Sequence, residues 1–285
     1  MKVLLITIML IITIIPINGE IPQPVDPNQC PSSDNPNQYT ECEKMQRESS
    51  KEVKFVDAYF GEIINNTPIK KEIAPNKGIA TLIVILVNTG HFELMGVKGW
   101  LTLPYGLESL DGNLVAFDTY DLPVKQGGLI YLEFPIKVND VNIGLYNAPL
   151  YVEYFRARDQ GIQFREMSIQ FRVTGESKLD AYTIKPILSI GKNEIIINII
   201  NNGSATSYST QVNLLSNALV IFGNKTIPIG DIKPQEVTPI KLNAYVNPML
   251  ANRIEQLNIV IEYIDSYGNR NTKDINLEFM IEGST

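Results

Sequence analysis

Few residues in this sequence have the types and spacing that chemistry would need. His91 is the single histidine, so a Ser-His-Asp triad would have to use it, yet no nucleophile motif accompanies it. The sequence contains no Gly-x-Ser-x-Gly, His-Glu-x-x-His, Cys-x-x-Cys or glycine-rich phosphate loop. We therefore expect a protein that is not an enzyme, with no catalytic residues, no cofactor and no resident metal.

Two turns carry oxygen ligands of the kind that calcium takes in loops. Asp111-Gly112-Asn113 is one, and residues 265–269 are the other. Neither stretch has the spacing of an EF-hand loop. Asp, Asn and Gly also favour tight turns through their backbone preferences, which accounts for both stretches without a metal.

Three Asn-x-Ser/Thr acceptors for N-glycosylation are present, at Asn65, Asn202 and Asn224. Each lies in an expected turn at the end of a strand, where a bulky glycan fits. Because the chain is rich in asparagine, such triplets also arise by chance. In an exported protein we expect at least one of the three to be modified.

Cys30 and Cys42, the only cysteines, lie within residues 20–50, a stretch rich in Pro, Asn, Gln and Ser without apolar periodicity. In an oxidising compartment an isolated pair predicts one disulfide, which here would close a short local loop. Two free thiols or an intermolecular link are the alternatives. Two thiolates without nearby histidines cannot complete the tetrahedral shell of a zinc site.

The N-terminus reads as a secretory signal peptide. Lys2 supplies the positive charge, residues 3–15 are apolar, and Gly19 precedes a polar stretch, so we expect cleavage after it. The alternative is a retained anchor, but the run is shorter than the ~20 residues of a spanning helix and ends at Pro16. No other segment is long enough to span. We expect an extracellular or cell-surface protein with no transmembrane anchor in the mature chain.

Composition narrows the class of protein further. The formal net charge of −7 disfavours a nucleic-acid partner, because the phosphate backbone binds to basic surfaces. A hydrophobic share of 44% with 19% charged residues is typical of a globular chain. A length of 285 residues suggests two domains, at ~100–200 residues per domain.

The elements that would hold these residues are mainly strands. Residues 131–138, 166–173 and 274–281 alternate between apolar and polar side chains, which predicts strands with one buried face. Residues 81–87 and 194–200 are apolar on both faces, as in central strands that are covered on both sides. Helical spacing is scarce, and its best candidate is the short stretch 249–257. The pattern predicts an all-β fold.

An internal repeat divides the chain. Residues 82–90 resemble residues 195–203, and both end in Asn-x-Gly. The interval from Asn88 to Tyr154 is 66 residues, and the interval from Asn201 to Tyr263 is 62. Two copies of about 110 residues fit two tandem immunoglobulin-like β-sandwich domains.

The resulting organisation has four parts: a signal peptide at 1–19, an irregular Pro/Asn-rich leader at 20–51, a first immunoglobulin-like domain at 52–176 and a second at 177–285. The boundary falls near residues 174–177. Because this linker is short, it restricts reorientation of the domains and predicts a semi-rigid rod.

A family resemblance rests on two turn-and-strand phrases. Residues 229–236 (IGDIKPQE) lead into the alternating strand 239–246, and Gly144-Leu145-Tyr146 leads into residues 150–154 (LYVEY). Both resemble archaeal S-layer-related immunoglobulin-like domains of the CARDB and NEW3 groups, over residues 52–282 as two copies. The resemblance implies seven-stranded sandwiches in envelope or adhesion proteins. The chain departs from it in having Pro234-Gln235 where Pro-Gly is usual and in lacking a C-terminal membrane anchor.

Trp100, the only tryptophan, lies next to Gly99. By parity with Val97 and Leu101 its ring points away from the core, where it could contact a neighbour. A bulge at Gly99 would instead reverse the parity and bury the ring, and we favour this second interpretation.

Together these features predict a non-enzymatic, exported structural or adhesion glycoprotein of the cell surface, associated with an S-layer. Its expected partners are other envelope or surface proteins, with self-assembly as a further mode of contact. One alternative is an extracellular filament subunit in which residues 20–50 donate a strand to a neighbour's sheet. Another is a carbohydrate-binding accessory module, which predicts an exposed aromatic platform built from Tyr105, Tyr120 and Tyr146.

Overall fold

The computed structural model describes residues 52–157 and 162–283, and the statements below concern only these residues. Their regular structure is β-strand throughout, apart from one 3-10 turn, η2 (Pro248–Leu250). The prediction of an all-β fold is confirmed. No helix in this part of the chain has the length and apolar character needed to cross a bilayer.

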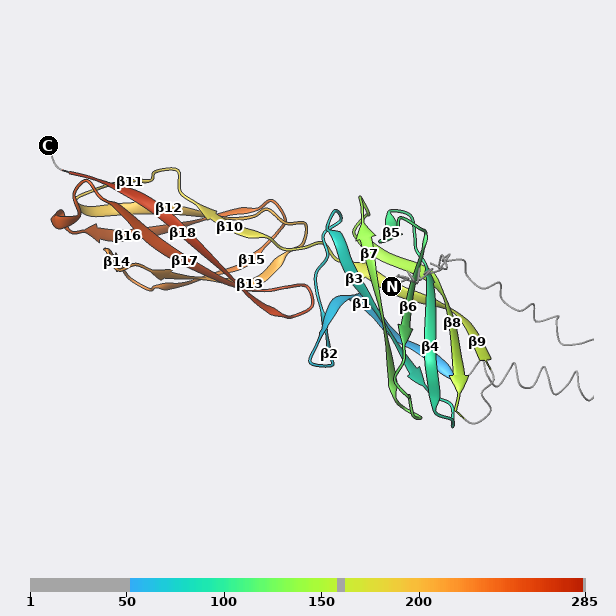
Figure 1. Cartoon of the computed structure of the whole chain (residues 1–285). Coiled ribbons are helices and arrows are strands. Elements are labelled where there is room, and N and C mark those ends of the chain that lie inside the picture. The colour runs from blue at the N-terminus through green and yellow to red at the C-terminus, as the bar shows by residue number, and fades with distance from the viewer. Residues whose placement is uncertain (1–51, 158–161, 284–285) are drawn as a thin grey trace, which may run out of the picture.

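The N-terminal part contains two antiparallel sheets, with strand orders β2-β1-β3-β7-β5 and β6-β4-β8-β9 (Figure 1). Their strands are β1 (Val53–Ile64), β2 (Thr67–Lys70), β3 (Gly78–Asn88), β4 (Leu94–Thr102), β5 (Leu107–Ser109), β6 (Val115–Tyr120), β7 (Leu129–Val138), β8 (Gly144–Arg156) and β9 (Ile162–Val173).

The C-terminal part repeats this arrangement, with strand orders β10-β12-β16-β14 and β11-β18-β17-β13-β15. Its strands are β10 (Leu179–Tyr182), β11 (Ile187–Ser189), β12 (Gly191–Asn201), β13 (Ser207–Leu215), β14 (Leu219–Phe222), β15 (Thr226–Ile232), β16 (Val237–Val246), β17 (Ile254–Ile264) and β18 (Arg270–Glu282). The pairing is antiparallel except between β11 and β18, which run parallel.

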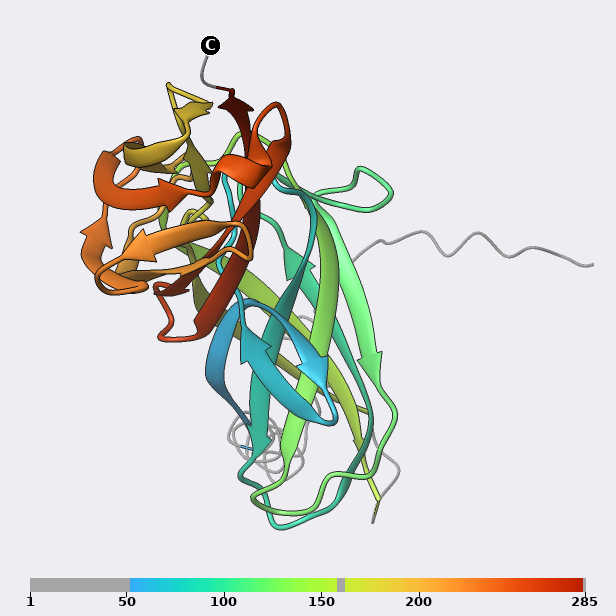
Figure 2. The ribbon, with the colours of Figure 1, turned by 90° about the vertical axis from the view of Figure 1, so that its left-hand side faces the viewer.

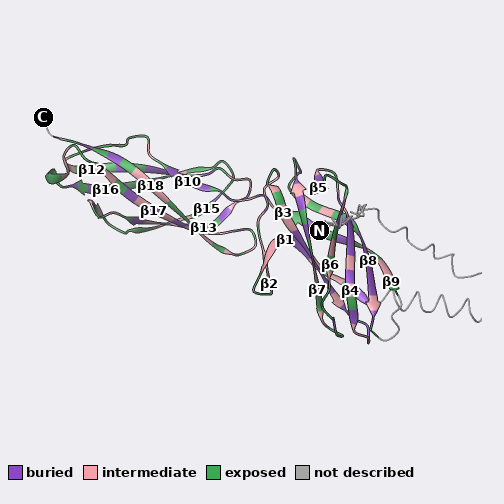
Figure 3. Cartoon of the chain, viewed as in Figure 1, coloured by how far each residue is buried: buried purple, intermediate pink, exposed green. Residues whose placement is uncertain are grey.

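The buried apolar residues fall into two large clusters, one within residues 53–173 and one within residues 179–281. We call residues 53–173 the N-terminal unit and residues 179–282 the C-terminal unit. Each cluster contains side chains from both sheets, such as Leu132 of β7 and Val152 of β8, so each pair of sheets forms a β-sandwich. Figure 3 shows the buried positions as stripes along the inner strands.

The alternating strands bury the predicted face. On β7, Leu132, Phe134, Ile136 and Val138 are each 0% exposed, and Phe279 and Ile281 on β18 are buried in the same way. Strand β3 is buried on both faces as predicted, because Tyr59 covers Ile83 and Ile85 on the face away from the main cluster. The matching prediction for β12 is only half right, since Ile196 is 39% exposed.

The prediction of helical structure at 249–257 is wrong. Pro248 begins a single 3-10 turn, in which Asn247 Oδ1 accepts a hydrogen bond from the Met249 amide. Asn252 then takes a positive φ of 64°, which ends the turn, and β17 begins at Ile254.

The sequence repeat corresponds to a repeated hydrogen-bond network. Asn88 and Asn201 are fully buried at the ends of β3 and β12. Asn88 Nδ2 donates to the Phe92 and Val124 carbonyls, and Asn201 Nδ2 donates to the Ala205 and Ile232 carbonyls. Each Oδ1 accepts from the amide of the glycine two residues later. The Asn-x-Gly signature therefore joins the same two segments in both units, the loop that follows its own strand and the segment that contains Val124 or Ile232.

A bulge also recurs at one place in both units. The register between β4 and β8 shifts between Met95 and Lys98, and the register between β13 and β17 shifts between Tyr208 and Gln211. Inside the shift the N-terminal unit has Gly96 at φ 54°, and the C-terminal unit has Ser209 at φ 48°. The two units thus share strand irregularities as well as strand order.

Candidate functional site

The two units lie end to end, and the β1–β2 hairpin of the N-terminal unit projects beside the junction (Figure 1). In the view turned by 90° the same hairpin lies next to the C-terminal unit (Figure 2). The hairpin turns at Asn65 and Asn66, both with positive φ, so the strands of the hairpin reverse in two residues. The chain then runs from Lys70 along the junction, where Ile73 forms a bridge with Gly175 of the linker.

Glu72 is the main contact across this junction. Its Oε2 accepts hydrogen bonds from the amide and the hydroxyl of Ser177, both at 2.7 Å. Its Oε1 accepts from the amide of Ser266 at 2.8 Å and from the Ser266 hydroxyl at 2.5 Å. One carboxylate thus joins the hairpin side of the N-terminal unit to the linker at Ser177 and to the β17–β18 loop of the C-terminal unit at Ser266. Hydrogen bonds to a charged acceptor are stronger than those between neutral groups.

We call Glu72 and its four hydrogen bonds to Ser177 and Ser266 the Glu72 clamp, and further contacts surround it. Asn269 Nδ2 donates to the Lys70 carbonyl at 2.9 Å, and Lys77 Nζ lies 2.7 Å from Glu176 Oε1. The loop that carries Ser266 and Asn269 is held by Asp265, whose Oδ1 accepts from the amide of Asn269. Burial raises the pKa of Tyr267 in that loop to about 12 although the charge of Arg172 acts to lower it. The loop is therefore a formed part of the junction.

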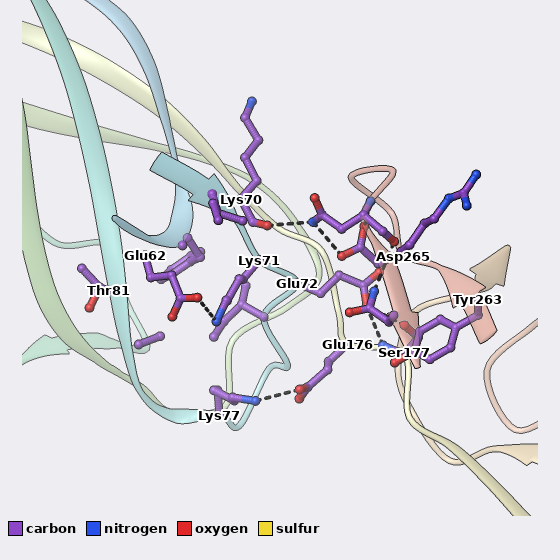
Figure 4. A pocket seen from close by; sticks show the side chains of 18 of the residues that line it. Glu62, Lys70, Lys71, Glu72, Lys77, Thr81, Glu176, Ser177, Tyr263 and Asp265 are labelled. Atoms are coloured by element: carbon purple, nitrogen blue, oxygen red, sulfur yellow. Dashed lines mark hydrogen bonds and ion pairs between the residues drawn. The ribbon is translucent and has the colours of Figure 1, made fainter. Parts of the chain in front are cut away.

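A cavity of about 670 Å³ lies at this junction (Figure 4). Its wall contains both lysines and carboxylates, and these are largely paired with each other. Lys71 pairs with Glu62 at 2.5 Å, Lys77 pairs with Glu176, and Lys70 pairs with Asp57 at 2.7 Å. The lysines of the wall are thus each paired with a carboxylate. We interpret the site as a structural junction.

The outer face of the β6-β4-β8-β9 sheet carries a second candidate surface. Trp100 of β4 contacts Phe117 of β6 at a ring distance of 5.1 Å and Tyr151 of β8 at 5.6 Å. Tyr151 in turn contacts Phe164 of β9 at 5.7 Å. We call these four rings the aromatic stripe, which crosses all four strands of the sheet. Phe117 is 43% exposed, so the stripe reaches the surface.

The structure decides between the two predicted orientations of the Trp100 ring, outward by parity or inward through a bulge at Gly99. A Cβ atom added at Gly99 would lie 2.5 Å from Leu132 Cδ1 of the facing sheet, so position 99 faces the core and Trp100 faces outward. The favoured prediction of a bulge at Gly99 is wrong, because the bulge lies at Gly96. Trp100 is nevertheless only 9% exposed, since its aromatic neighbours cover it.

Tyr151 carries an unusual hydroxyl. The side chain is 7% exposed, and its Oη has no hydrogen-bond partner among the residues that the structure describes. Burial raises the pKa of Tyr151 to about 12, with the charges of Glu153 and Glu166 acting in the same direction. A buried hydroxyl without a partner costs free energy, so this ring is retained at the expense of some stability.

The predicted site residues do not gather into one site. Asn65, Asn202 and Asn224 are all exposed and lie in separate turns, in keeping with their predicted positions. Cys30 and Cys42 lie outside the described residues, as do the predicted signal peptide and the whole of the predicted leader. His91 is exposed, and its Nδ1 lies 3.4 Å from Gln126 Nε2.

In the two turns considered for calcium, hydrogen bonds form within the turn itself. Asp265 Oδ1 accepts from the amides of Tyr267 and Asn269, and Oδ2 accepts from Asn269 Nδ2. The turn at Gly112 closes through a backbone hydrogen bond to Ser109. Within residues 52–157 and 162–283, no three His, Cys, Asp or Glu side chains are grouped so as to hold a metal ion.

The aromatic platform expected of a carbohydrate-binding module is not assembled. Tyr105 is 95% exposed, but Tyr120 and Tyr146 are half-buried against the core. Tyr146 stacks on Phe171 and donates its hydroxyl to the Asn142 carbonyl. The main support for that alternative is therefore missing.

Comparison with known proteins assigns no function. No family model and no curated protein matches the chain. Solved structures with similarity include a protein of unknown function from Porphyromonas gingivalis W83, at 14% identity and a TM-score of 0.25, covering 80% of this chain and 99% of that one. Red sea bream transglutaminase has 9% identity and a TM-score of 0.27, covering 88% of this chain and 34% of its own. The native conformation of E. coli alpha-2-macroglobulin has 9% identity and a TM-score of 0.30, covering 82% and 17%. TM-scores this low carry no argument.

Proposed function

We propose that this chain is an exported, non-enzymatic structural or adhesion protein of the cell surface, akin to S-layer-related proteins. Its residues 52–176 and 177–285 would form two immunoglobulin-like domains that contact other envelope proteins. The observation that carries the proposal is the Glu72 clamp, with its four hydrogen bonds to Ser177 and Ser266. A clamp of this kind supports a spacer of fixed shape, as a structural surface protein needs.

Two further features support contact with partners at the surface. The aromatic stripe supplies rings of the type that is enriched at protein interfaces. The exposure of Asn65, Asn202 and Asn224 leaves room for the glycans that we propose at one or more of them.

The location and the partners are tested on intact cells of the source organism. Surface crosslinking followed by mass spectrometry should recover this chain linked to envelope proteins, and glycopeptide mapping should show a modified acceptor. Finding the chain only in the cytosolic fraction would overturn the proposal. Unmodified peptides at all three acceptors would remove the glycoprotein part of it.

The clamp has its own test. Glu72→Ala removes all four hydrogen bonds and leaves the weaker contacts of Asn269 and Lys77, so the two units should reorient over a wider range and the distance distribution from small-angle X-ray scattering should broaden. The matched control is Glu62→Ala, which breaks only an exposed pair with Lys71 inside the N-terminal unit. Identical scattering of the Glu72→Ala variant and the unchanged chain would show that the clamp does not fix the shape.

A filament subunit assembled by strand donation is a second candidate. The observation that favours it is the open edge of β9, since no described strand other than β8 pairs with this strand. An open edge can accept a strand from another chain. Which strand this edge accepts is the question taken up next.

A further inference from the structure

Strand β9 differs from every other strand at the end of a described sheet. The other seven terminal strands are short: β2, β10 and β14 have 4 residues, β5 and β11 have 3, β6 has 6 and β15 has 7. Strand β9 has 12 residues. A long edge presents a row of unpaired backbone groups, which is a template for another strand.

Strand β9 also lacks several of the features that protect an edge, although it carries charged side chains, including Arg165 on the inward face. It pairs with β8 continuously, from Gly144↔Val173 to Phe155↔Ile162, without a register shift. It contains no proline and no glycine. The edge strand β15, by contrast, contains Pro228 and Gly230, and its register shifts. Proteins interrupt open edges with prolines, short strands and bulges, and β9 has none of these.

The counterpart of β9 in the C-terminal unit is partly covered. Strand β18 occupies the same place in its sheet, and β11 pairs with it in parallel from Ile187↔Met280 to Ser189↔Glu282. Among the described residues of the N-terminal unit, the one isolated backbone bridge near this place joins Ile73 to Gly175, beyond the end of β9. The open length of edge is therefore specific to the N-terminal unit.

The outward side chains of β9 are self-complementary. Glu166 and Arg172 are both exposed on the outer face, with the exposed polar residues Ser168 and Gln170 between them. In an antiparallel pair of two identical strands with the two-fold axis at Ile169, residue 166 of one copy lies opposite residue 172 of the other. Each Glu166 then faces an Arg172, twice per dimer, and Ser168 faces Gln170. Opposite charges that face each other across two strands stabilise the pair.

We propose that β9 pairs antiparallel with β9 of a second copy of this chain, about a two-fold axis at Ile169. The pairing joins two four-stranded sheets into one continuous sheet and brings Phe164, at the end of the aromatic stripe, beside the seam. It makes a second copy one of the partners of the proposed surface protein. It also stands apart from that proposal, because self-pairing does not depend on where the protein resides.

The test is sedimentation velocity on the protein purified as its host processes it. The unchanged chain should form a dimer, and Glu166→Arg should weaken dimerisation by about tenfold or more, because it places like charges opposite each other twice. Arg172→Glu should have the same effect. The double variant E166R/R172E restores both opposite pairs and should return the affinity to about the original value.

Control variants distinguish the loss of β9 pairing from other causes of weaker dimerisation. Asp274 on β18 occupies the position that corresponds to Glu166, because it lies opposite Val260 of β17 as Glu166 lies opposite Tyr151 of β8. Asp274→Arg should leave the dimer unchanged. Arg172 also acts on Tyr267 across the junction, so Glu166→Arg is the cleaner single variant. Emission from Trp100 checks that the N-terminal unit of each variant is folded, and far-UV circular dichroism checks the C-terminal unit of Asp274→Arg.

Three results would overturn the proposal. The first is a monomer at all concentrations for the unchanged chain. The second is a dimer that both single charge reversals leave intact, or that the double variant fails to restore. The third is a dimer that survives the charge reversals but disappears when residues 20–51 are deleted, since this would identify the leader as the strand that the edge accepts.

Discussion

The two units place different side chains on the same sheet geometry. In the N-terminal unit Trp100 lies opposite Phe117 and Tyr151, and at the corresponding positions of the C-terminal unit Asn213 lies opposite Thr226 and Val260. The first set forms the aromatic stripe. In the second set Thr226 Oγ1 donates to Asn213 Oδ1, whose Nδ2 group donates to Glu262 Oε1.

The shared positions and the different positions have different roles. The buried asparagines, the bulges and the inward apolar residues recur in both units, so they specify the sandwich itself. The outer face is not needed for the fold, because the C-terminal unit folds the same sheet with amides and a threonine there. The aromatic stripe is therefore a property added to the N-terminal unit.

The largest expected effect comes from the stripe. Trp100→Ala should lower the free energy of unfolding by about 3–5 kcal/mol, because the ring is buried against the rings of Phe117 and Tyr151. Asn213→Ala at the matching position should cost about 1 kcal/mol, the value of a typical hydrogen bond. Urea unfolding followed by far-UV circular dichroism measures both. Equal losses would mean that the stripe adds no stability of its own.

The buried asparagines test what the units share. Asn88→Ala and Asn201→Ala should each cost about 2–4 kcal/mol, since each leaves buried backbone groups without partners. Calorimetry should show losses of similar size, with the emission of Trp100 identifying the N-terminal unit. Asn202→Ala, at an exposed neighbour, is the control and should stay within about 0.5 kcal/mol. A large loss in only one unit would break the equivalence.

The raised pKa of Tyr151 predicts how the stability of the folded chain depends on pH. Its pKa is raised from 10.0 to about 12, so the unfolded chain loses this proton near pH 10 and the folded chain retains it to about pH 12. The stability from this group is complete below pH 10 and is lost between pH 10 and pH 12. Tyr151→Phe should reduce that alkaline loss and add about 1 kcal/mol at pH 7, because it removes a hydroxyl without a partner.

Thermal unfolding from pH 7 to pH 12 checks the Tyr151 prediction. The control is Tyr105→Phe, on a ring that is 95% exposed. A loss of stability at pH 7 in the Tyr151→Phe variant would show that the hydroxyl has a partner in solution.

The smallest effects concern backbone strain in the C-terminal unit. Ser209 and Gln235 have positive φ where the N-terminal unit has Gly96 and Gly127. Ser209→Gly and Gln235→Gly should each stabilise by about 0.5 kcal/mol, because relief of the left-handed conformation exceeds the added entropy of the unfolded chain. Gly96→Ser should destabilise by about 1 kcal/mol. Calorimetric melting temperatures compare the three variants, and a destabilising Ser209→Gly would contradict this account.

Sequence patterns predicted the parts of this fold that local chemistry determines. Alternation identified the inward residues of β7 and β18, and the repeat identified Asn88 and Asn201, because such signals lie within one strand or one turn. The junction could not be predicted in this way. Glu72 binds Ser177 and Ser266, which lie 105 and 194 residues away, and no periodic pattern links these positions.

The aromatic stripe on the outer face of the β6-β4-β8-β9 sheet also could not be predicted from the sequence. Parity alone pointed Trp100 outward, but the favoured prediction of a bulge at Gly99 was wrong, and the burial of the ring depends on Phe117 and Tyr151 of two other strands. Equally, the alternation within residues 166–173 predicted a strand without showing that β9 lies at an edge. Strand order is a property of the whole sheet, so it became visible only in the structure.

The position of Glu72 has a mechanical consequence. The two hydrogen bonds from Ser266 act in parallel with the covalent linker at residues 174–178, whereas the two from Ser177 end within the linker itself. Tension along the long axis therefore loads the Ser266 pair before it loads either core, and because both bonds converge on Oε1 of one carboxylate, they break and re-form together. The molecule would then lengthen in one reversible step while both sandwiches stay folded, and a chain fixed at a cell surface could absorb a pull in this way without unfolding.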